Sequence, residues 1–198
     1  MENARKWVIV RIDGRIAAIS TDYAALAGIS ARLAMQKSPA YSKITAETVG
    51  FDQVWNIRMN ARWEDMILFG TEFQKKVWRR LFDLTHDGEG GHITPRLISY
   101  SDFADLCQNK AGVRAVAHAI GLNPVAVVIP CHLVIPKESI DYLRDVREKA
   151  QSTIFKGDDI CLNNLLREKG IDFGEYALGR SLKRELIQLE HSSSSDNM

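Results

Sequence analysis

The sequence has few of the features that would assign it to a class at once. Its three cysteines are widely spaced, with no Cys-x-x-Cys pair and no histidine cluster at metal-ligand spacing. This pattern argues against a disulfide-rich secreted domain and against a metal site, and it indicates a reducing compartment. No apolar run approaches the about eighteen residues that a membrane helix needs. We therefore expect a soluble protein of the cytoplasm, with no membrane partner.

The chain also has almost no excess of charge. Its 26 lysines and arginines nearly balance its 25 aspartates and glutamates, which leaves a formal net charge of +1. Domains that bind nucleic acid are often strongly basic, so any DNA site in this chain must be a local patch. A length of 198 residues with 45% hydrophobic content allows one good core, or one large and one small core. We expect two lobes.

The stretch with the clearest chemical content is residues 123–136, Asn-Pro-Val-Ala-Val-Val-Ile-Pro-Cys-His-Leu-Val-Ile-Pro. Its β-branched runs and prolines place the Cys131 thiol on short, rigid backbone. A thiol attacks as thiolate, so a nucleophilic Cys131 needs a base or positive charge nearby, and His132 is the nearest candidate. In extended chain, consecutive side chains point to opposite faces, so their pairing requires a turn at Pro130 or a bridging water. Taken alone, such a cysteine is more often a small buried hydrophobe.

Residues 1–69 carry local structure signals but no recognisable chemistry. Two β-rich runs, residues 7–12 and 15–20, flank an Asp-Gly dipeptide and predict a hairpin. Residues 22–36 predict a helix, and residues 48–59 are again strand-like. We interpret this part as a plain scaffold.

Residues 99–120 predict two short helices joined by a tight turn. Ser99 or Ser101 can cap a helix that runs through Cys107, and residues 112–120 form the second helix. The second helix has small residues on one face, which allow its backbone to approach a groove closely. This arrangement suggests a helix-turn-helix, a shape that docks on DNA but has many other uses.

Three segments together resemble the O6-alkylguanine-DNA alkyltransferases. The family's active-site signature is Pro-Cys-His-Arg-Val after an Asn-Pro turn, and it is matched by Asn123, Pro130, Cys131, His132 and Val134. Leu133 replaces the usual arginine, and Ala126 stands where some members carry proline. Residues 73–78, Phe-Gln-x-x-Val-Trp, resemble the helix that opens the family's domain. Residues 174–179 resemble its Gly-x-Tyr-x-x-Gly segment.

The resemblance implies an α/β (α+β) fold. A small N-terminal α/β lobe over residues 1–69 precedes a mainly helical alkyltransferase domain over residues 70–198 with a helix-turn-helix. That domain opens with a helix at the capping box of Thr71 and Gln74, whose apolar stripe is Phe73, Val77, Trp78 and Leu81. A loop over residues 86–95 follows.

Two later parts of the chain depart from the family pattern. Residues 137–169 are charged and helix-like, and they form an insertion that can be a lid, a dimer contact or decoration. The Ser-rich tail from residue 191 is expected to be disordered.

The implied activity is direct, single-turnover transfer of an alkyl group from O6-alkylguanine in DNA to Cys131, without a cofactor. The resemblance assigns the catalytic roles. Glu190 orients His132, which draws the thiol proton through water. Asn123 holds the turn before the active-site strand. Tyr176 lines the guanine pocket, and either Tyr176 or a nearby donor protonates the leaving base.

The implied partner is double-stranded DNA, bound in the minor groove by a monomer that is nucleoid-associated when bound. The DNA-binding residues are Arg114, Tyr100, Ser101, Asn109 and Gln74. Arg114 fills the gap left by a flipped guanine, and Tyr100 pushes the phosphate of that nucleotide round. Flipping is needed because chemistry on a stacked base cannot reach its atoms, and it costs a few kcal/mol.

Two alternatives stay open on the sequence. An alkyltransferase-like protein binds alkylated DNA without repairing it, and the changes at Leu133 and Ala126 keep this reading open. A Cys-His hydrolase forms an acyl-enzyme and turns over, although the sequence has no evident oxyanion hole.

Overall fold

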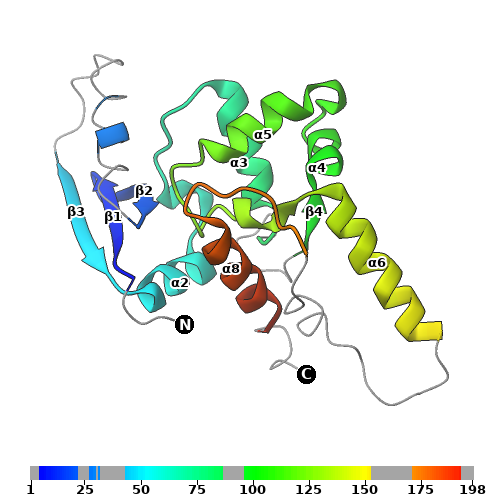
Figure 1. Cartoon of the computed structure of the whole chain (residues 1–198). Helices are drawn as coiled ribbons and strands as arrows, with labels where there is room; N and C mark the ends of the chain where they lie inside the picture. The colour runs from blue at the N-terminus through cyan, green and yellow to red at the C-terminus, as the bar shows by residue number, and fades with distance from the viewer. Residues whose placement is uncertain are drawn as a thin grey trace. The chain divides into compact units, whose positions relative to one another are not determined.

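The computed structural model describes most of the chain (Figure 1). The chain divides into two compact units. The described residues are 5–21, 27–29, 31, 43–86, 96–152 and 171–192. The first unit takes its described residues from 1–93 and 114–131, and the second from 94–113 and 132–198. The division therefore falls between Cys131 and His132. The domain boundary placed near residue 70 follows the family resemblance rather than packing, and it stays a prediction.

The first unit begins with a three-stranded antiparallel sheet in the order β2-β1-β3. Its strands are β1 (Trp7–Ile12), β2 (Arg15–Ser20) and β3 (Ile44–Val49). The predicted hairpin of β1 and β2 is confirmed. Its turn residues have the left-handed backbone of a two-residue hairpin turn, with φ of 47° at Asp13 and 83° at Gly14. Hairpin residues pack into a hydrophobic cluster of Val8, Val10, Ile12, Ala17, Ala18, Ile29 and Phe69.

Two predictions for the segments after the hairpin have different outcomes. Of the helix predicted over residues 22–36, only residues 27–29 and 31 are described, and they are helical. The strand predicted over residues 48–59 is wrong for most of its length, because α2 (Phe51–Asn60) occupies it. Gly50 caps this helix. Its β-branched and aromatic residues suggested a strand, whereas its buried residues, Val54 and Arg58, are four apart, as on one face of a helix.

Helix α3 (Glu72–Phe82) begins at the predicted capping box. Thr71 Oγ1 accepts a hydrogen bond from the backbone N–H of Gln74 at 3.2 Å, and Gln74 Oε1 accepts one from the backbone N–H of Thr71 at 2.9 Å. The predicted apolar stripe is buried except for Phe73, which is 37% exposed. Phe73 lies in the first turn, ahead of the buried part of the helix.

His86, which we placed at the start of a loop, is buried. Its ring stacks on Phe82 with 3.8 Å between ring centroids, and its Nε2 lies 3.1 Å from the backbone oxygen of Arg58. The Arg58 guanidinium donates to Thr85 Oγ1 at 2.9 Å. These buried polar contacts join α2 to the end of α3. The rest of that predicted loop, residues 87–95, lies outside the described residues.

Helix α5 (Val113–Gly121) and the segment after it also belong to the first unit. The indole N–H of Trp78 donates to a backbone oxygen of α5 at 2.8 Å, which joins α5 to α3. Beyond α5, the backbones of Pro124 and Ala126 bond to Ile19 in β2 at 3.0 and 3.2 Å. The chain ahead of the Cys-His pair is therefore anchored to the N-terminal sheet.

The second unit contains a short parallel pair of strands, β4 (Ile98–Ser99) and β5 (Val134–Ile135). Of the two candidate caps, Ser99 begins α4 (Tyr100–Leu106), because its Oγ accepts a backbone N–H of the first turn at 3.1 Å. A 3-10 turn, Lys110–Gly112, then leads to α5. The predicted order of helix, turn and helix is therefore present.

Helix α6 (Lys137–Ser152) occupies the first half of the predicted insertion over residues 137–169. Leu143 of this helix is buried, and Ile140 and Val146 pack beside it. The residues of the same cluster from other parts of the unit are Leu97, Ile135, Ile171, Phe173 and Ile187. This part of the predicted insertion is therefore core and not surface decoration, while the rest, from residue 153, lies outside the described residues.

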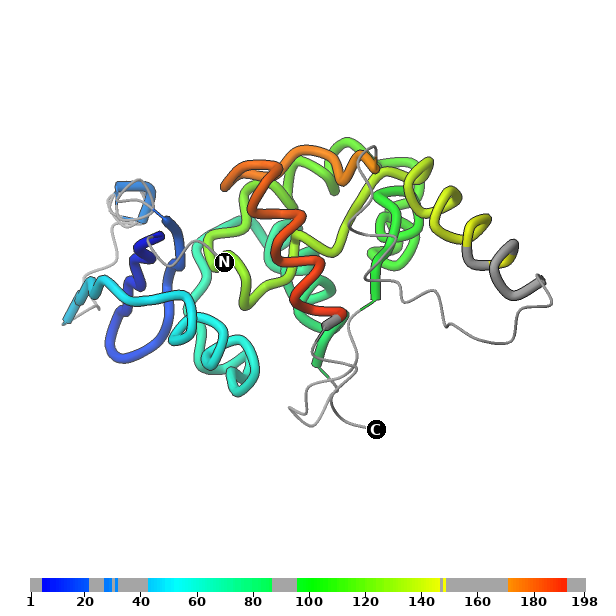
Figure 2. The backbone as a smooth tube through the Cα atoms, turned by 60° about the horizontal axis from the view of Figure 1, so that its bottom comes forward, coloured from blue at the N-terminus to red at the C-terminus, as the bar shows by residue number. Residues whose placement is uncertain are grey.

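Helix α8 (Arg180–Ser192) is the last described element, and Figure 2 shows residues 171–179 leading into it. His191 lies in its last turn, so the tail expected to be disordered from residue 191 begins as helix; residues 193–198 lie outside the described residues. In the described parts of the chain, no helix is long and apolar enough to cross a membrane.

Candidate active site

Cys131 and His132 lie in one turn of 3-10 helix, Cys131–Leu133, and not on extended chain. The β-branched residues on both sides suggested a strand here, but β5 begins only after the turn. The backbone N–H of Cys131 donates to the oxygen of Ile129 at 2.8 Å. A turn of the kind that pairing of the two side chains requires therefore follows Pro130 directly.

Asn123 contacts the candidate nucleophile. Its Oδ1 accepts the backbone N–H of Val125 at 3.0 Å, while its Nδ2 donates to the oxygen of Ile129 at 2.8 Å and to Cys131 Sγ at 3.0 Å. Cys131 is buried and forms no disulfide bond. An N–H donor favours the thiolate over the thiol, because the negatively charged sulfur is the stronger acceptor. Asn123 therefore holds the turn and contacts the sulfur with the same amide.

His132 is paired with Glu190 of α8 within the second unit. His132 Nε2 and Glu190 Oε1 are 2.9 Å apart, and both side chains are buried. Because a carboxylate can only accept, the hydrogen lies on Nε2, and Nδ1 carries the lone pair of the neutral ring. A neutral imidazole of this tautomer can take a proton at Nδ1, and the carboxylate then stabilises the imidazolium.

Tyr176 lies in the segment that leads into α8. The backbone N–H of Gly179 donates to the oxygen of Tyr176 at 2.9 Å. Gly174 and Gly179 have φ of 76° and 97°, a backbone that glycine adopts without strain. The Gly-x-Tyr-x-x-Gly spacing is therefore a requirement of this turn, which leaves the Tyr176 side chain half-buried.

Lys183 belongs to the same unit, and sequence reasoning missed it. Its side chain is fully buried, and its Nζ donates to the backbone oxygens of Val134 at 2.7 Å and Glu175 at 3.3 Å. The Nζ also lies 5.7 Å from the centre of the Tyr100 ring. A buried ammonium is costly unless it is hydrogen-bonded. One feature of the sequence could have pointed to Lys183. It lies two helical turns before Glu190, so the two residues share one face of α8.

The first two candidate DNA-binding residues open α4. Tyr100 is half-buried and contacts Lys183 as described. Ser101 Oγ lies 2.9 Å from Ser99 Oγ, at the N-terminus of the helix. The structure therefore gives both residues local partners within the second unit.

The other three candidate DNA-binding residues are spread over three elements. Arg114 is exposed on α5. Asn109 lies in the turn before it, where a Cβ on Gly112 would come within 2.4 Å of the Asn109 side chain, so a larger residue there would displace that side chain. Gln74 is engaged in the capping box of α3. Asn109 and Gln74 therefore have structural roles of their own.

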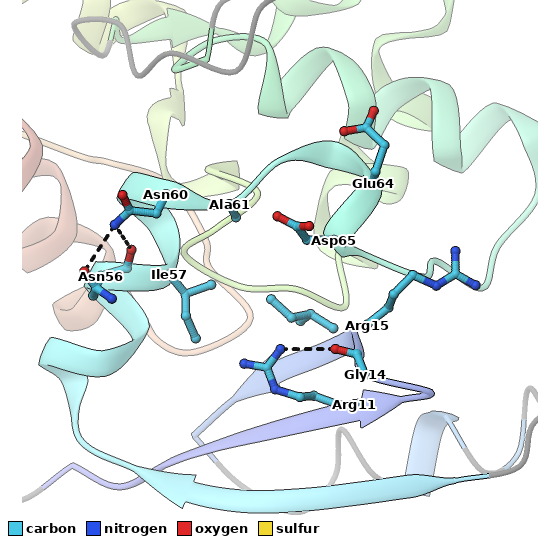
Figure 3. Close-up of a pocket in the computed structure, with 10 residues that line it drawn as sticks. Arg11, Gly14, Arg15, Asn56, Ile57, Asn60, Ala61, Glu64 and Asp65 are labelled. Carbon is cyan, nitrogen blue, oxygen red and sulfur yellow. Dashed lines mark hydrogen bonds between the residues drawn. The ribbon is translucent and has the colours of Figure 1, made fainter.

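The described residues offer no group of three or more His, Cys, Asp or Glu side chains that could hold a metal ion. They do line a pocket of about 330 Å³ in the first unit (Figure 3). Of its lining residues, Arg11 pairs with Glu47 at 3.3 Å, and Asp65 accepts the backbone N–H of Arg62 at 2.8 Å. No nucleophile and no candidate catalytic residue lines this pocket, so we do not place the active site there.

Residues 72–152 match the family model for the DNA-binding domain of 6-O-methylguanine DNA methyltransferase. These residues make up less than half of the chain, and the match shows what they are similar to. The matched segment contains α3 to α6 and the Cys-His turn, so it includes the first part of residues 137–169, and the insertion predicted there stays a prediction. Residues 174–190, which carry Tyr176 and Glu190, lie beyond the matched segment.

Curated relatives carry the name of the same family. A probable methylated-DNA–protein-cysteine methyltransferase of Acanthamoeba polyphaga mimivirus is 41% identical over 75 residues, which are 38% of this chain and 45% of the relative. The inducible methylated-DNA–protein-cysteine methyltransferase of Bacillus subtilis is 43% identical over 68 residues, 34% of each chain. The Candida glabrata enzyme is 30% identical over 124 residues, 63% of this chain and 41% of the relative. The matches span less than half the length of these relatives.

The fold is also found in a solved methyltransferase structure. The O6-methylguanine-DNA methyltransferase of Pyrococcus kodakaraensis has a TM-score of 0.54 with this chain at 19% identity, and the match covers 96% of this chain and 95% of that one. At this identity the similarity shows the fold alone. The predicted fold class, a small lobe with a sheet and a mainly helical domain, is confirmed.

Proposed function

We propose that this protein repairs DNA by transferring an alkyl group from O6-alkylguanine to Cys131 in a single turnover. The observation that carries the proposal is the Cys131–His132 turn, with Asn123 Nδ2 on the sulfur at 3.0 Å and Glu190 on the imidazole at 2.9 Å. A nucleophile next to a base that is oriented by a third group is the arrangement of activated cysteines. Methyltransferase names among the relatives support the same reaction.

In the proposed reaction the Cys131 sulfur attacks the alkyl carbon on guanine O6. A carbon–sulfur bond forms, the carbon–oxygen bond breaks, and its electron pair stays on the base. His132 takes the thiol proton through a water molecule, Tyr176 protonates the leaving guanine, and the proton on His132 returns to Tyr176 through solvent. The sum converts thiol and alkylguanine into thioether and guanine without a cofactor. No step cleaves the thioether, so each molecule acts once.

The proposed substrate is double-stranded DNA, bound in the minor groove by a monomer in the cytoplasm. The match of residues 72–152 to a DNA-binding domain supports this partner. Arg114 fills the space left by the flipped guanine, and Tyr100 rotates the phosphate of that nucleotide. Ser101, Asn109 and Gln74 are the other residues proposed to contact DNA. Base flipping costs a few kcal/mol, which an inserted cation offsets by filling the stack.

The test is an intact-mass measurement after incubation with duplex DNA that contains one O6-methylguanine. We expect a stable shift of one methyl group, mapped by peptide mass to Cys131. Cys131→Ser should bind the duplex and gain no methyl, whereas Cys107→Ser and Cys161→Ser should react normally. Methyl transfer by Cys131→Ser would contradict the proposal.

The second candidate function is that of an alkyltransferase-like protein, which binds alkylated DNA without repairing it. Leu133 favours it, because this residue stands where the family signature has arginine and is fully buried. Tight binding of the methylated duplex with no mass shift would select this function. Multiple turnovers on a thiol-directed ester would instead select a hydrolase.

A further inference from the structure

Val127 has a backbone conformation that β-branched residues rarely adopt. Its φ is 73°, in the left-handed region, where a branched side chain is crowded against its own backbone. Val127 is also fully buried, so its side chain cannot turn to solvent. We propose that this strained residue is a positioning device for the Cys131 thiol, an inference that rests on the alkyl transfer proposed above.

Contacts on both sides hold the chain in this conformation. Before Val127, the backbone N–H of Ala126 donates to the oxygen of Ile19 in β2 at 3.2 Å. After it, the N–H of Ile129 donates to the oxygen of Val125 at 3.0 Å, which closes a tight turn around Val127. A strained residue persists only where its surroundings over-determine it. Here the N-terminal sheet and the closed turn do so together.

The turn brings Cys131 back to Asn123, eight positions earlier in the chain. In extended backbone, eight residues span ~26 Å, whereas Asn123 Nδ2 lies 3.0 Å from Cys131 Sγ and 2.8 Å from the oxygen of Ile129. The chain reversal at Val127 is therefore what puts the sulfur within reach of the amide. Val127 acts through these two residues and contacts no substrate in the proposed reaction.

The strain is measured by comparing glycine with alanine at the same position. Glycine adopts left-handed backbone without penalty and alanine does not, so Val127→Gly should melt a few degrees above Val127→Ala. Val128 is the matched control, because it is equally buried and its φ is not positive. Val128→Gly should melt below Val128→Ala, since glycine loses more chain entropy on folding.

The effect on the thiol is measured by the pH dependence of Cys131 alkylation with iodoacetamide, in protein that carries Cys107→Ser and Cys161→Ser. Val127→Gly relaxes the turn and loosens the amide-to-sulfur contact. Its pH midpoint should therefore move to higher pH than that of Val127→Ala, although it is the more stable variant. Asn123→Ala removes the donor and should show the same shift. A residue that only fills space would leave the midpoint unchanged.

Three results would overturn the inference. A Val127→Gly protein that melts below Val127→Ala would show that the turn is not strained. A shift in Asn123→Ala without one in Val127→Gly would show that the turn does not position the sulfur, and no shift in either would show that the amide does not act on it. Neither readout uses alkylated DNA, so a failure of methyl transfer would count against the proposed function alone.

Discussion

Glu190 accepts a hydrogen bond from His132 Nε2 at 2.9 Å, across 58 positions of sequence. Both side chains are buried, and an unpaired carboxylate would cost several kcal/mol in such a place. The last turns of α8 therefore have to pack against His132 for this pair to form. The same contact fixes the tautomer of the imidazole, which links the packing of α8 to the chemistry proposed for Cys131.

Glu190→Gln keeps the size of the side chain and removes its charge. A glutamine oxygen can still accept from Nε2, so we expect the fold to survive. The imidazolium loses its negative partner, and with it the thiolate loses a favourable charge. Transfer to free O6-benzylguanine should therefore slow roughly tenfold at neutral pH, about 1.4 kcal/mol, and its pH–rate profile should move to higher pH.

The control for this change is Glu185→Gln, which removes the same charge from the same helix. It should leave the pH–rate profile in place. If Glu190→Gln and Glu185→Gln give the same profile as the unmodified protein, Glu190 has only a structural role, and His132 acts without it.

Local signals in the sequence were enough for the elements that are held by local contacts. The capping box of Thr71 and Gln74 and the Asp-Gly hairpin depend on residues a few positions apart, and both are present. The strand predicted across α2 was wrong because β-branched and aromatic residues indicate a buried face but not its period. Whether the helical period of 3.6 residues or the strand period of two applies to residues 51–60 depends on which other elements this segment packs against.

Only those residues of the candidate site that belong to a recognised sequence motif could be predicted. Cys131, His132 and Asn123 lie close together in sequence, whereas the contacts of Lys183 with Val134 and Tyr100 depend on how α8 packs. Nothing in the residue types around Val127 indicates a positive φ, because valine normally avoids it. That conformation is imposed by the sheet and the closed turn, which a linear pattern does not contain.

Arg114→Ala tests whether this exposed residue of α5 acts on the duplex. Only the duplex requires a base to be flipped and the gap to be filled. We expect at least a roughly tenfold loss with methylated duplex and little change with free O6-benzylguanine. Arg144→Ala, which removes an exposed charge from α6, should affect neither. Equal losses on both substrates would show that Arg114 acts on folding or on the chemistry.

Leu143→Ala tests whether α6 belongs to the core of its unit. The buried side chain packs in the cluster with Ile171 and Ile187, and such truncations cost roughly 2–5 kcal/mol. Leu106→Ala, at a position 45% exposed on α4, should cost much less. Urea denaturation measures both. If the two truncations lower the free energy of unfolding equally, α6 does not belong to the core of its unit.

Residues 153–170 can be tested separately from α6. Replacing them with a short Gly-Ser linker should leave the free energy of unfolding and the repair rate near those of the unmodified protein, because the cost of closing a flexible loop rises only slowly with its length. Loss of duplex binding at an unchanged melting temperature would mean that they belong to the DNA-binding face.

His191→Gln tests the acid sensitivity of α8. The pKa of His191 is lowered because burial disfavours its charged form; the charge of Glu190 acts in the opposite direction, and that of His132 lowers the pKa further. As pH falls below the ordinary value of 6.5, the unfolded chain takes up this proton before the folded chain does. The free energy of unfolding therefore falls in that window, down to the folded-state pKa.

The variant should lose less unfolding free energy between pH 7 and pH 5.5 than the unmodified protein does, because it lacks this proton uptake. His118→Gln, on the exposed face of α5, is the matched control and should not change the difference. Urea denaturation at the two pH values measures it. If His191→Gln loses as much unfolding free energy between the two pH values as the unmodified protein, other groups take up the proton.

Lys183→Met replaces a buried ammonium by an apolar side chain of similar length. The oxygens of Val134 and Glu175 lose their donor, and a buried acceptor left without a partner costs about 1–3 kcal/mol. If Lys183 also fixes the strand after the Cys-His turn and the loop that carries Tyr176, the transfer rate should fall as well. Leu143→Ala serves for comparison. It should cost a comparable amount of stability, and the Leu143 side chain makes no hydrogen bond to that strand or loop. If Lys183→Met and Leu143→Ala have equal transfer rates, Lys183 contributes only to stability. If the rate of Lys183→Met is several-fold lower and Lys183→Arg partly restores it, Lys183 is a positioning residue of the site.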